Sequence, residues 1–293
     1  PIKSICQISQ NELCLGTDGK GTKIFNIPKQ LITDYPFDNN YLDSGTSKVH
    51  SVLKDNAGNL WIAIYQKGVM MIPAQPNSFK YIGYKSINKN IIGSNCITSL
   101  CRDHKGILWI GTDNDGIYGI TTELKQKVHY APHDSPSSVP STVFGLYEDS
   151  EHNLWFGSYT NGLGRLDKKT GQCSYLQNLT DKNGNRIQRV YDLVEDQDKR
   201  LWIATMGAGL FYYDLKTGQS VYDPKFNAAT KKYKWISCLL YAGDNHLYVG
   251  TYDGIRCIDL STDDFKTEEI LSRHIIHSLY EDPQGNIWIG NSE

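Results

Sequence analysis

The sequence predicts an all-β fold, a seven-bladed β-propeller of four-stranded antiparallel blades. Three observations predict it: one motif recurs seven times, its copies are almost evenly spaced, and each copy contains turns that form hairpins. The motif Leu-Trp-Ile-Gly-Thr is intact at 108–112, and its Trp position holds Cys14, Trp61, Trp109, Trp155, Trp202, Tyr248 and Trp288. These residues are 47, 48, 46, 47, 46 and 40 positions apart. A repeat of that length is typical of propeller blades.

Each repeat opens on a strand-like segment followed by a tight turn. The segments start at Ile2, Val49, Ile97, Val143, Val190, Ile236 and Ile276, and five of them carry an acid six residues later: Asp55, Asp103, Asp149, Asp196 and Asp282. Asp can bond a turn backbone, and Gly can adopt a positive φ. Where the turn lacks Gly, the same position holds Asn11, His152, Lys199 or Asn245. We expect a hairpin here, with these residues in the left-handed conformation.

Packing between blades is predicted from two periodic positions. The Trp recurs once per repeat, and we interpret it as the wedge between neighbouring sheets. The third residue of the first strand is small or short, as expected near a crowded axis: Ser4, Ser51, Ser99, Gly145, Asp192, Cys238 and Ser278. Residues 1–293 are therefore predicted to form a single propeller. The last repeat ends soon after its second strand, so we expect an incomplete last blade and further residues in a longer parent chain.

Composition excludes several classes of protein. The 30 Lys and Arg nearly balance the 32 Asp and Glu, which argues against nucleic acid as a partner. No apolar run approaches the roughly 20 residues that span a bilayer. The seven cysteines leave at least one thiol unpaired, and we interpret those in apolar strands as small buried hydrophobic residues.

The repeat resembles the two-component regulator propeller repeat. The matching consensus is Val-x-x-Leu-x-x-Asp-x-x-Gly-x-Leu-Trp-Ile-Gly-Thr-x-x-x-Gly-Leu, which is closest at 97–119, 49–68 and 276–290 and weakest at 2–25 and 236–257. The resemblance implies the periplasmic sensor of a hybrid two-component histidine kinase of Bacteroidetes. It also implies a glycan-fragment ligand, control of polysaccharide-utilisation genes, further domains of the same parent chain, and a homodimer formed through that parent.

The sequence contains no recognisable catalytic motif, and we predict neither a metal nor a cofactor. Gly-x-Ser-x-Gly, His-Glu-x-x-His, a phosphate-binding Gly-rich loop and paired Cys-x-x-Cys are all absent. The histidines are interpreted as isolated surface residues. We therefore expect that this chain is not an enzyme and that kinase activity belongs to a domain outside it.

The candidate binding residues lie where the end of the second strand and the start of the first strand should open on one face. The residue four after the Trp position is Tyr65, Tyr159 or Tyr252 in alternate repeats, and these rings could stack on sugars; chance is the alternative, because Tyr is common here. The same rim gathers basic residues, namely Lys3, Lys48, His50, Arg189, Lys234, Arg273 and His277. They favour an acidic or sulfated oligosaccharide, against the alternative of ordinary solvated loop charge.

Two other functions stay open at this point. Some single-ring propellers are lyases or hydrolases, and Asp192 is the one acid at the small position, with His50 and His277 expected near the same mouth. A scaffold for protein interaction or dimerisation is the third possibility, because loop variation alone can create a binding face.

Overall fold

The computed structural model describes residues 1–35, 46–75, 82, 92–121, 127–181, 183–222, 227, 234–262 and 265–292. Within these ranges, 25 strands form seven antiparallel sheets, one for each sequence repeat. The chain divides into two compact units, Pro1–Ile92 and Gly93–Glu293. The all-β prediction and the assignment of one sheet to each repeat are therefore confirmed.

The first unit contains two sheets. One comprises β1 (Ile2–Ser9), β2 (Glu12–Thr17), β3 (Thr22–Asn26) and β4 (Leu31–Asp34), in that order. The other comprises β5 (Val49–Lys54), β6 (Leu60–Ile64) and β7 (Gly68–Ile72). The fourth strand predicted for this repeat would follow Gln75 and lies outside the described residues.

The second unit contains five sheets. Four of them have four strands each, which are β8 (Ile97–Arg102), β9 (Leu108–Thr112), β10 (Ile117–Ile120) and β11 (Lys127–Tyr130); β12 (Val143–Glu148), β13 (Leu154–Ser158), β14 (Leu163–Leu166) and β15 (Cys173–Tyr175); β16 (Val190–Glu195), β17 (Arg200–Thr205), β18 (Leu210–Asp214) and β19 (Gln219–Tyr222); and β20 (Ile236–Ala242), β21 (His246–Thr251), β22 (Gly254–Asp259) and β23 (Thr267–Ser272). The fifth sheet pairs β24 (Ile275–Glu281) with β25 (Ile287–Ser292). The prediction that the last blade has only its first two strands is confirmed for the described residues.

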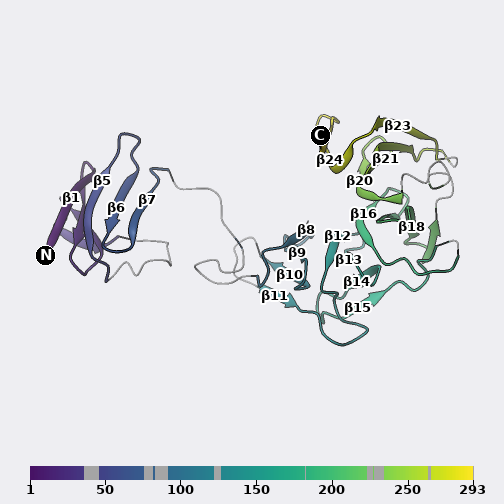
Figure 1. Ribbon diagram of the computed structural model, residues 1–293, viewed down its shortest axis with the longest axis horizontal. Helices are drawn as coiled ribbons and strands as arrows, with labels where there is room; N and C mark the ends of the chain where they lie inside the picture. Colours follow the sequence, from purple (N-terminus) through teal and green to yellow (C-terminus); the bar gives the residue numbers. More distant parts are fainter. Residues whose placement is uncertain are drawn as a thin grey trace. The chain divides into compact units, whose positions relative to one another are not determined.

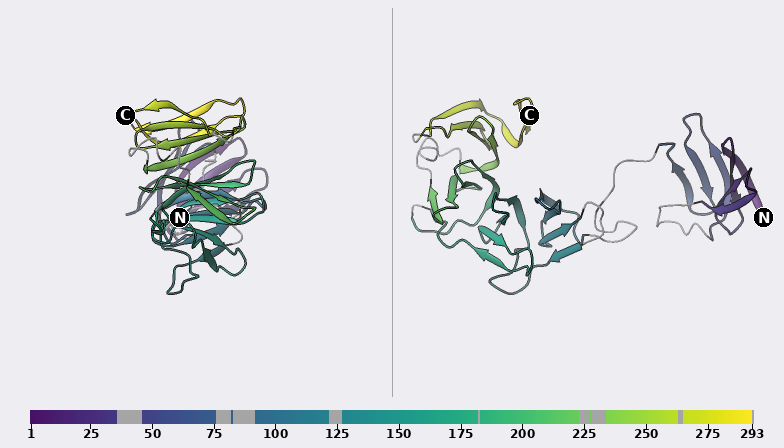
Figure 2. Two further views of the ribbon diagram at one scale, coloured as in Figure 1. Left: turned by 90° about the vertical axis from the view of Figure 1, so that its right-hand side faces the viewer. Right: turned by 180° about the vertical axis from the view of Figure 1, so that it is seen from behind.

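Sheets that follow one another in sequence are also neighbours in space within each unit. The first strands contact in the order β8, β12, β16, β20 and β24, and β1 contacts β5 in the other unit. Figure 1 shows this succession in the second unit, and Figure 2 shows it from behind. In a propeller, the first strands of successive blades lie side by side on the inner side of the ring. The organisation of all seven blades in a single ring stays a prediction.

One hydrogen-bonded unit recurs inside five blades and explains two of the periodic residues together. The predicted turn Asp accepts a backbone N–H across the turn with one carboxylate oxygen, as Asp149 does from Asn153 at 2.8 Å. Its other oxygen accepts the indole N–H of the repeat Trp, at 2.7–2.9 Å in all five pairs. The two repeats without the Trp also lack the Asp: Ile8 precedes Cys14, and Ala242 precedes Tyr248. Asp and Trp therefore form one structural unit.

The wedge prediction is confirmed for Trp109, Trp155 and Trp202, which are at most 3% exposed. Each packs with hydrophobic residues of the following blade; Trp155, for example, clusters with Val190 and Leu193 of β16. For Trp61 and Trp288, which are 40% and 63% exposed, the wedge role stays a prediction. Each of these two lies in the last sheet of its own unit, so no following sheet of that unit covers it.

The predicted left-handed turn position is confirmed in six repeats. Gly58, Gly106 and Gly285 have positive φ there, and so do His152, Lys199 and Asn245, at 68°, 69° and 64°. The prediction is wrong for Asn11, which is not among the residues with positive φ. Ile8 replaces the Asp that spans the other turns, and β1 reaches β2 through a shorter link in which Ser9 pairs with Glu12.

In two blades, the small residue of the first strand has a role beyond fitting a crowded space. The Ser4 hydroxyl accepts the N–H of Val52 at 3.0 Å, and an oxygen of Asp192 accepts the N–H of Leu239 at 2.8 Å. Both contacts reach the first strand of the next blade. Close approach also explains the motif glycine: a Cβ on Gly157 would lie 2.5 Å from the Val190 carbonyl oxygen. Neighbouring blades thus meet through backbone as well as side chains.

All seven cysteines are free. Cys14, Cys238 and Cys257 are buried, which agrees with their interpretation as small hydrophobic residues, whereas Cys6 and Cys101 from the same set are only partly buried. Of the other two, Cys173 is buried and Cys96 is exposed. Burial raises the pKa of the Cys14 and Cys173 thiols to about 12. The buried thiols therefore stay protonated and unreactive near neutral pH.

Trp155→Ala should destabilise the fold by about 3–5 kcal/mol, because it removes a large aromatic side chain from a packed interface between blades. Tyr159→Ala is the control: it removes an aromatic side chain of the same blade that is 42% exposed. That control should cost less than about 1 kcal/mol. Urea denaturation followed by fluorescence measures both, and equal losses would contradict the wedge role.

Candidate functional site

The predicted rim exists as one edge of the sheets. The residue four after the Trp position donates its backbone N–H to the carbonyl of the residue that precedes the first strand of the same blade. Tyr65 bonds Lys48 at 2.9 Å, Met206 bonds Arg189 at 3.0 Å, and Tyr252 bonds Trp235 at 3.2 Å. If the four strands of a blade are named A to D in chain order, the B–C turn and the start of strand A therefore open on a common face, as the repeat predicted.

In the first unit, the structure brings together Tyr65, His50 and Lys48. The Tyr65 ring is 49% exposed and stacks on His50, with ring centroids 5.0 Å apart. The ammonium of Lys48 lies 3.8 Å from Asp18, and that of Lys3 lies 3.5 Å from the same residue. Asp18 therefore offsets part of the positive charge expected at this rim.

In the second unit, aromatic residues form a row across three successive blades. The Phe144 ring stacks on Tyr191 at 4.5 Å and meets Tyr159 edge to face at 5.8 Å. Burial and the nearby Tyr252 phenol raise the pKa of Tyr191. The Tyr252 ring lies 5.6 Å from that of Trp235. We call this set the aromatic row: Tyr159, Phe144, Tyr191, Tyr252 and Trp235.

The cationic candidates of the second unit have different surroundings. The Arg189 guanidinium lies over the Tyr159 ring, 5.0 Å from its centroid, and so joins the aromatic row. Arg273 adopts a left-handed φ of 64° and donates its backbone N–H to Asp253 at 3.2 Å. His277 lies on β24 with its Nε2 3.3 Å from the Ser292 hydroxyl. Lys234 precedes β20, and its carbonyl accepts the N–H of Gly207 at 2.7 Å.

Sequence reasoning missed Phe144, Tyr191 and Trp235, although the repeat alignment contained the signal. Phe144 and Tyr191 follow the first residue of strand A, the position that holds His50 and His277 in other repeats. Trp235 precedes strand A, as Lys48 and Arg189 do. The search for basic residues at these positions passed over the aromatic ones.

Asp192 is fixed by two backbone donors. Its Oδ1 accepts the backbone N–H of Leu193 at 2.9 Å, and its Oδ2 accepts the backbone N–H of Leu239 at 2.8 Å. Burial raises the pKa of Asp192 to about 6, and the two hydrogen bonds limit the rise. The carboxyl group therefore links two blades, and both of its oxygens are already engaged.

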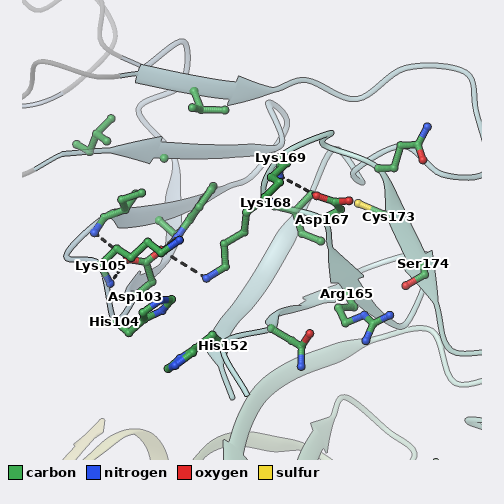
Figure 3. A pocket seen from close by; sticks show the side chains of 18 of the residues that line it. Asp103, His104, Lys105, His152, Arg165, Asp167, Lys168, Lys169, Cys173 and Ser174 are labelled. Carbon is green, nitrogen blue, oxygen red and sulfur yellow. Dashed lines mark hydrogen bonds and ion pairs between the residues drawn. The ribbon is translucent and has the colours of Figure 1, made fainter. Parts of the chain in front are cut away.

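A cavity of about 860 Å³ lies at the opposite end of the strands, where the A–B turns and C–D turns gather. It is lined by side chains of the third and fourth blades, among them Asp103, His104, His152, Arg165, Lys168 and Lys169 (Figure 3). Lys168 reaches across it to Glu148 and lies 3.5 Å from Asp103. Burial acts to raise the pKa of Glu148, but hydrogen bonds from Lys168 and His104 outweigh it and the pKa is lowered.

Neither His104 nor His152 was predicted to act in a site. The structure stacks their rings, with centroids 3.7 Å apart, beside the Glu148 carboxylate. Both lie in A–B turns of adjacent repeats, and turns of adjacent blades are neighbours. Comparing successive turns would have placed the two histidines together.

Part of the chain matches a known repeat family. Four segments, 91–114, 137–160, 180–207 and 270–293, match the family model of the two-component regulator propeller. The chain therefore carries two-component regulator propeller repeats. No curated protein matches the chain. In the part of the chain that the structure describes, no helix has the length and apolar character that crossing a membrane would require.

Solved structures support the fold. The extracellular domain of BT4673 from B. thetaiotaomicron, a candidate one-component system, aligns with a TM-score of 0.60 and 21% identity over 99% of this chain. That of BT3049 from the same organism, a candidate hybrid two-component system, aligns with a TM-score of 0.56 and 21% identity over 98% of this chain. The chain spans only 41% and 44% of the length of those two extracellular domains.

The pKa of Asp192 predicts how stability depends on pH. The pKa of Asp192 in the folded chain, about 6, exceeds its ordinary value of 3.8, so folding favours the protonated carboxyl group. The contribution of Asp192 to the free energy of unfolding is therefore fully present below pH 4 and is lost as the pH rises through about 6. Asp192→Ser keeps an acceptor, as in Ser4, but no titrating group. The unfolding free energy of the parent relative to this variant should fall by about 1–2 kcal/mol between pH 4 and pH 7, less than the full shift because the residue is only half-buried. A pH-independent difference in urea melts would contradict this account.

Proposed function

We propose that this chain is the ligand-sensing propeller of a hybrid two-component sensor and that it binds an oligosaccharide at the rim. The aromatic row is the observation that carries the proposal. The wedge role between blades belongs to the buried Trp109, Trp155 and Trp202. The rings of the row are additional: Tyr159, Tyr252 and Trp235 are 42–43% exposed.

Sugar recognition suits this row. The C–H faces of a pyranose ring are apolar and pack on exposed aromatic rings, while polar groups beside the rings orient the hydroxyl groups. The row spans three blades, so successive rings could take successive sugar units. Its aromatic side chains are held by each other, as Phe144 is between Tyr159 and Tyr191. A preorganised surface loses little conformational entropy on binding.

Charge at the row favours an acidic or sulfated glycan. Arg189 lies against Tyr159, and a planar guanidinium can donate two hydrogen bonds to one carboxylate or sulfate. In the first unit, Lys48 shares Asp18 with Lys3, so its charge is partly offset. Arg189 is therefore the stronger candidate for contacting an anionic group.

The wider role follows from the repeat family and is part of the same proposal. We place the chain in the periplasm as one propeller ring, joined to further domains of its parent, which dimerises and controls transcription of polysaccharide-utilisation genes. Kinase activity would belong to those domains, and this chain would bind ligand without catalysis or nucleic-acid contact. The enzyme alternative relied on Asp192 as its acid, but both oxygens of that residue accept backbone N–H groups.

Alanine at Tyr159 and Arg189 together should abolish binding of an acidic or sulfated oligosaccharide and leave the melting temperature nearly unchanged. Both changes remove exposed side chains, and neither removes a buried one. Calorimetry against a panel of neutral, uronate-containing and sulfated oligosaccharides is the measurement.

Tyr280→Ala is the matched control, because Tyr280 is 62% exposed but lies toward the A–B turn of the last repeat. It should leave binding intact. If the double variant binds a ligand of the parent chain as tightly as the parent does, the rim is not the binding site.

A further inference from the structure

A cluster of two histidines and one glutamate lies between the third and fourth blades. Ligand atoms of His104, Glu148 and His152 all lie within 4.8 Å of one another. His104 Nδ1 is 2.8 Å from Glu148 Oε1. Both histidines are exposed, whereas the Glu148 side chain is only 9% exposed. A rigid carboxylate is thus flanked by two imidazoles that solvent can reach.

Part of this cluster is an ordinary contact between blades. The backbone N–H of His104 donates to Glu148 Oε2 at 2.6 Å. Ser150 makes the same contact with Glu195 at 2.6 Å, and Gly243 makes it with Glu281 at 3.1 Å. The carboxylate therefore has a structural role at three interfaces. The pair of imidazoles is an addition at one of them, since Ser150 and Gly243 occupy the position of His104 in the other two.

We propose that His104, Glu148 and His152 bind a divalent transition-metal ion of the Zn²⁺ type. Two imidazole nitrogens and a carboxylate oxygen form a donor set typical of zinc, with water completing the tetrahedron. In such a site the ligand atoms are about 3.3 Å apart, given bond lengths of about 2.0–2.1 Å. The three atoms already lie within 4.8 Å of one another, and the ion would join the turns of two blades.

Ion binding requires two side chains to move. The imidazole rings are stacked at an interplanar angle of 22°, so their lone pairs cannot converge until one ring turns. His152 is exposed and sits at the tip of its turn, and can rotate. Lys168 must also release Glu148, which it contacts with its ammonium group. The Lys168 ammonium group therefore competes with the ion for the Glu148 carboxylate.

The test uses the full chain without an affinity tag, titrated with ZnCl₂ in a calorimeter. The parent should bind one ion per chain, and His104→Ser with His152→Asn should weaken binding by more than about tenfold. Both replacements copy residues that other repeats of this chain use at the same positions, Ser150 and Asn245, so the fold is retained. Zinc should raise the melting temperature of the parent but not of this double variant.

Three controls separate this site from other zinc ligands. Lys168→Met should strengthen zinc binding several-fold, because it removes a competing cation. His246→Ala removes a histidine that lies 3.1 Å from the Asp244 carboxylate but is not part of the two-histidine cluster. This variant should bind zinc as the parent does. With Co²⁺ as the probe, the near-ultraviolet spectrum should lack a thiolate-to-metal charge-transfer band, which excludes the cysteines. Zinc binding that persists in the double variant, or no binding to the parent, would overturn the proposal.

Discussion

In five of the seven blades, the hydrogen bond between the turn aspartate and the repeat tryptophan anchors the hairpin on which the rest of the blade is built. It ties the A–B turn to strand B, and it satisfies an indole N–H that would otherwise be buried without an acceptor at Trp109, Trp155 and Trp202. The apolar part of each indole is then free to pack against the next blade. Local turn chemistry and packing between blades therefore depend on the same pair of side chains.

Most of the fold could be predicted from the sequence because it is periodic. The spacing of the motif, the turn residues and the alternation of apolar positions are local properties, and each repeat confirms the others. Partners across blades could not be predicted in the same way. Asp192 was visible as an exception among small residues, but its bonds to Leu193 and Leu239 depend on how closely two first strands approach.

The candidate sites show the same division. Alignment of the repeats placed Tyr159 and Arg189 on a common edge, and the cation–π contact at 5.0 Å is consistent with that placement. The aromatic row was harder to predict, because its members come from three different repeat positions and become a row only when three blades are assembled. His104 and His152 are also isolated in the sequence, and only packing of adjacent turns stacks their rings.

The contact between neighbouring A–B turns has a consequence for how such chains can diversify. The glutamate accepts a backbone N–H, so this contact does not require a particular side chain at the donor position. The residue there is His, Ser or Gly at positions 104, 150 and 243. Substitutions there leave the junction between blades intact. The residue at this position can therefore change and bring new chemistry to the surface while the contact between blades is retained.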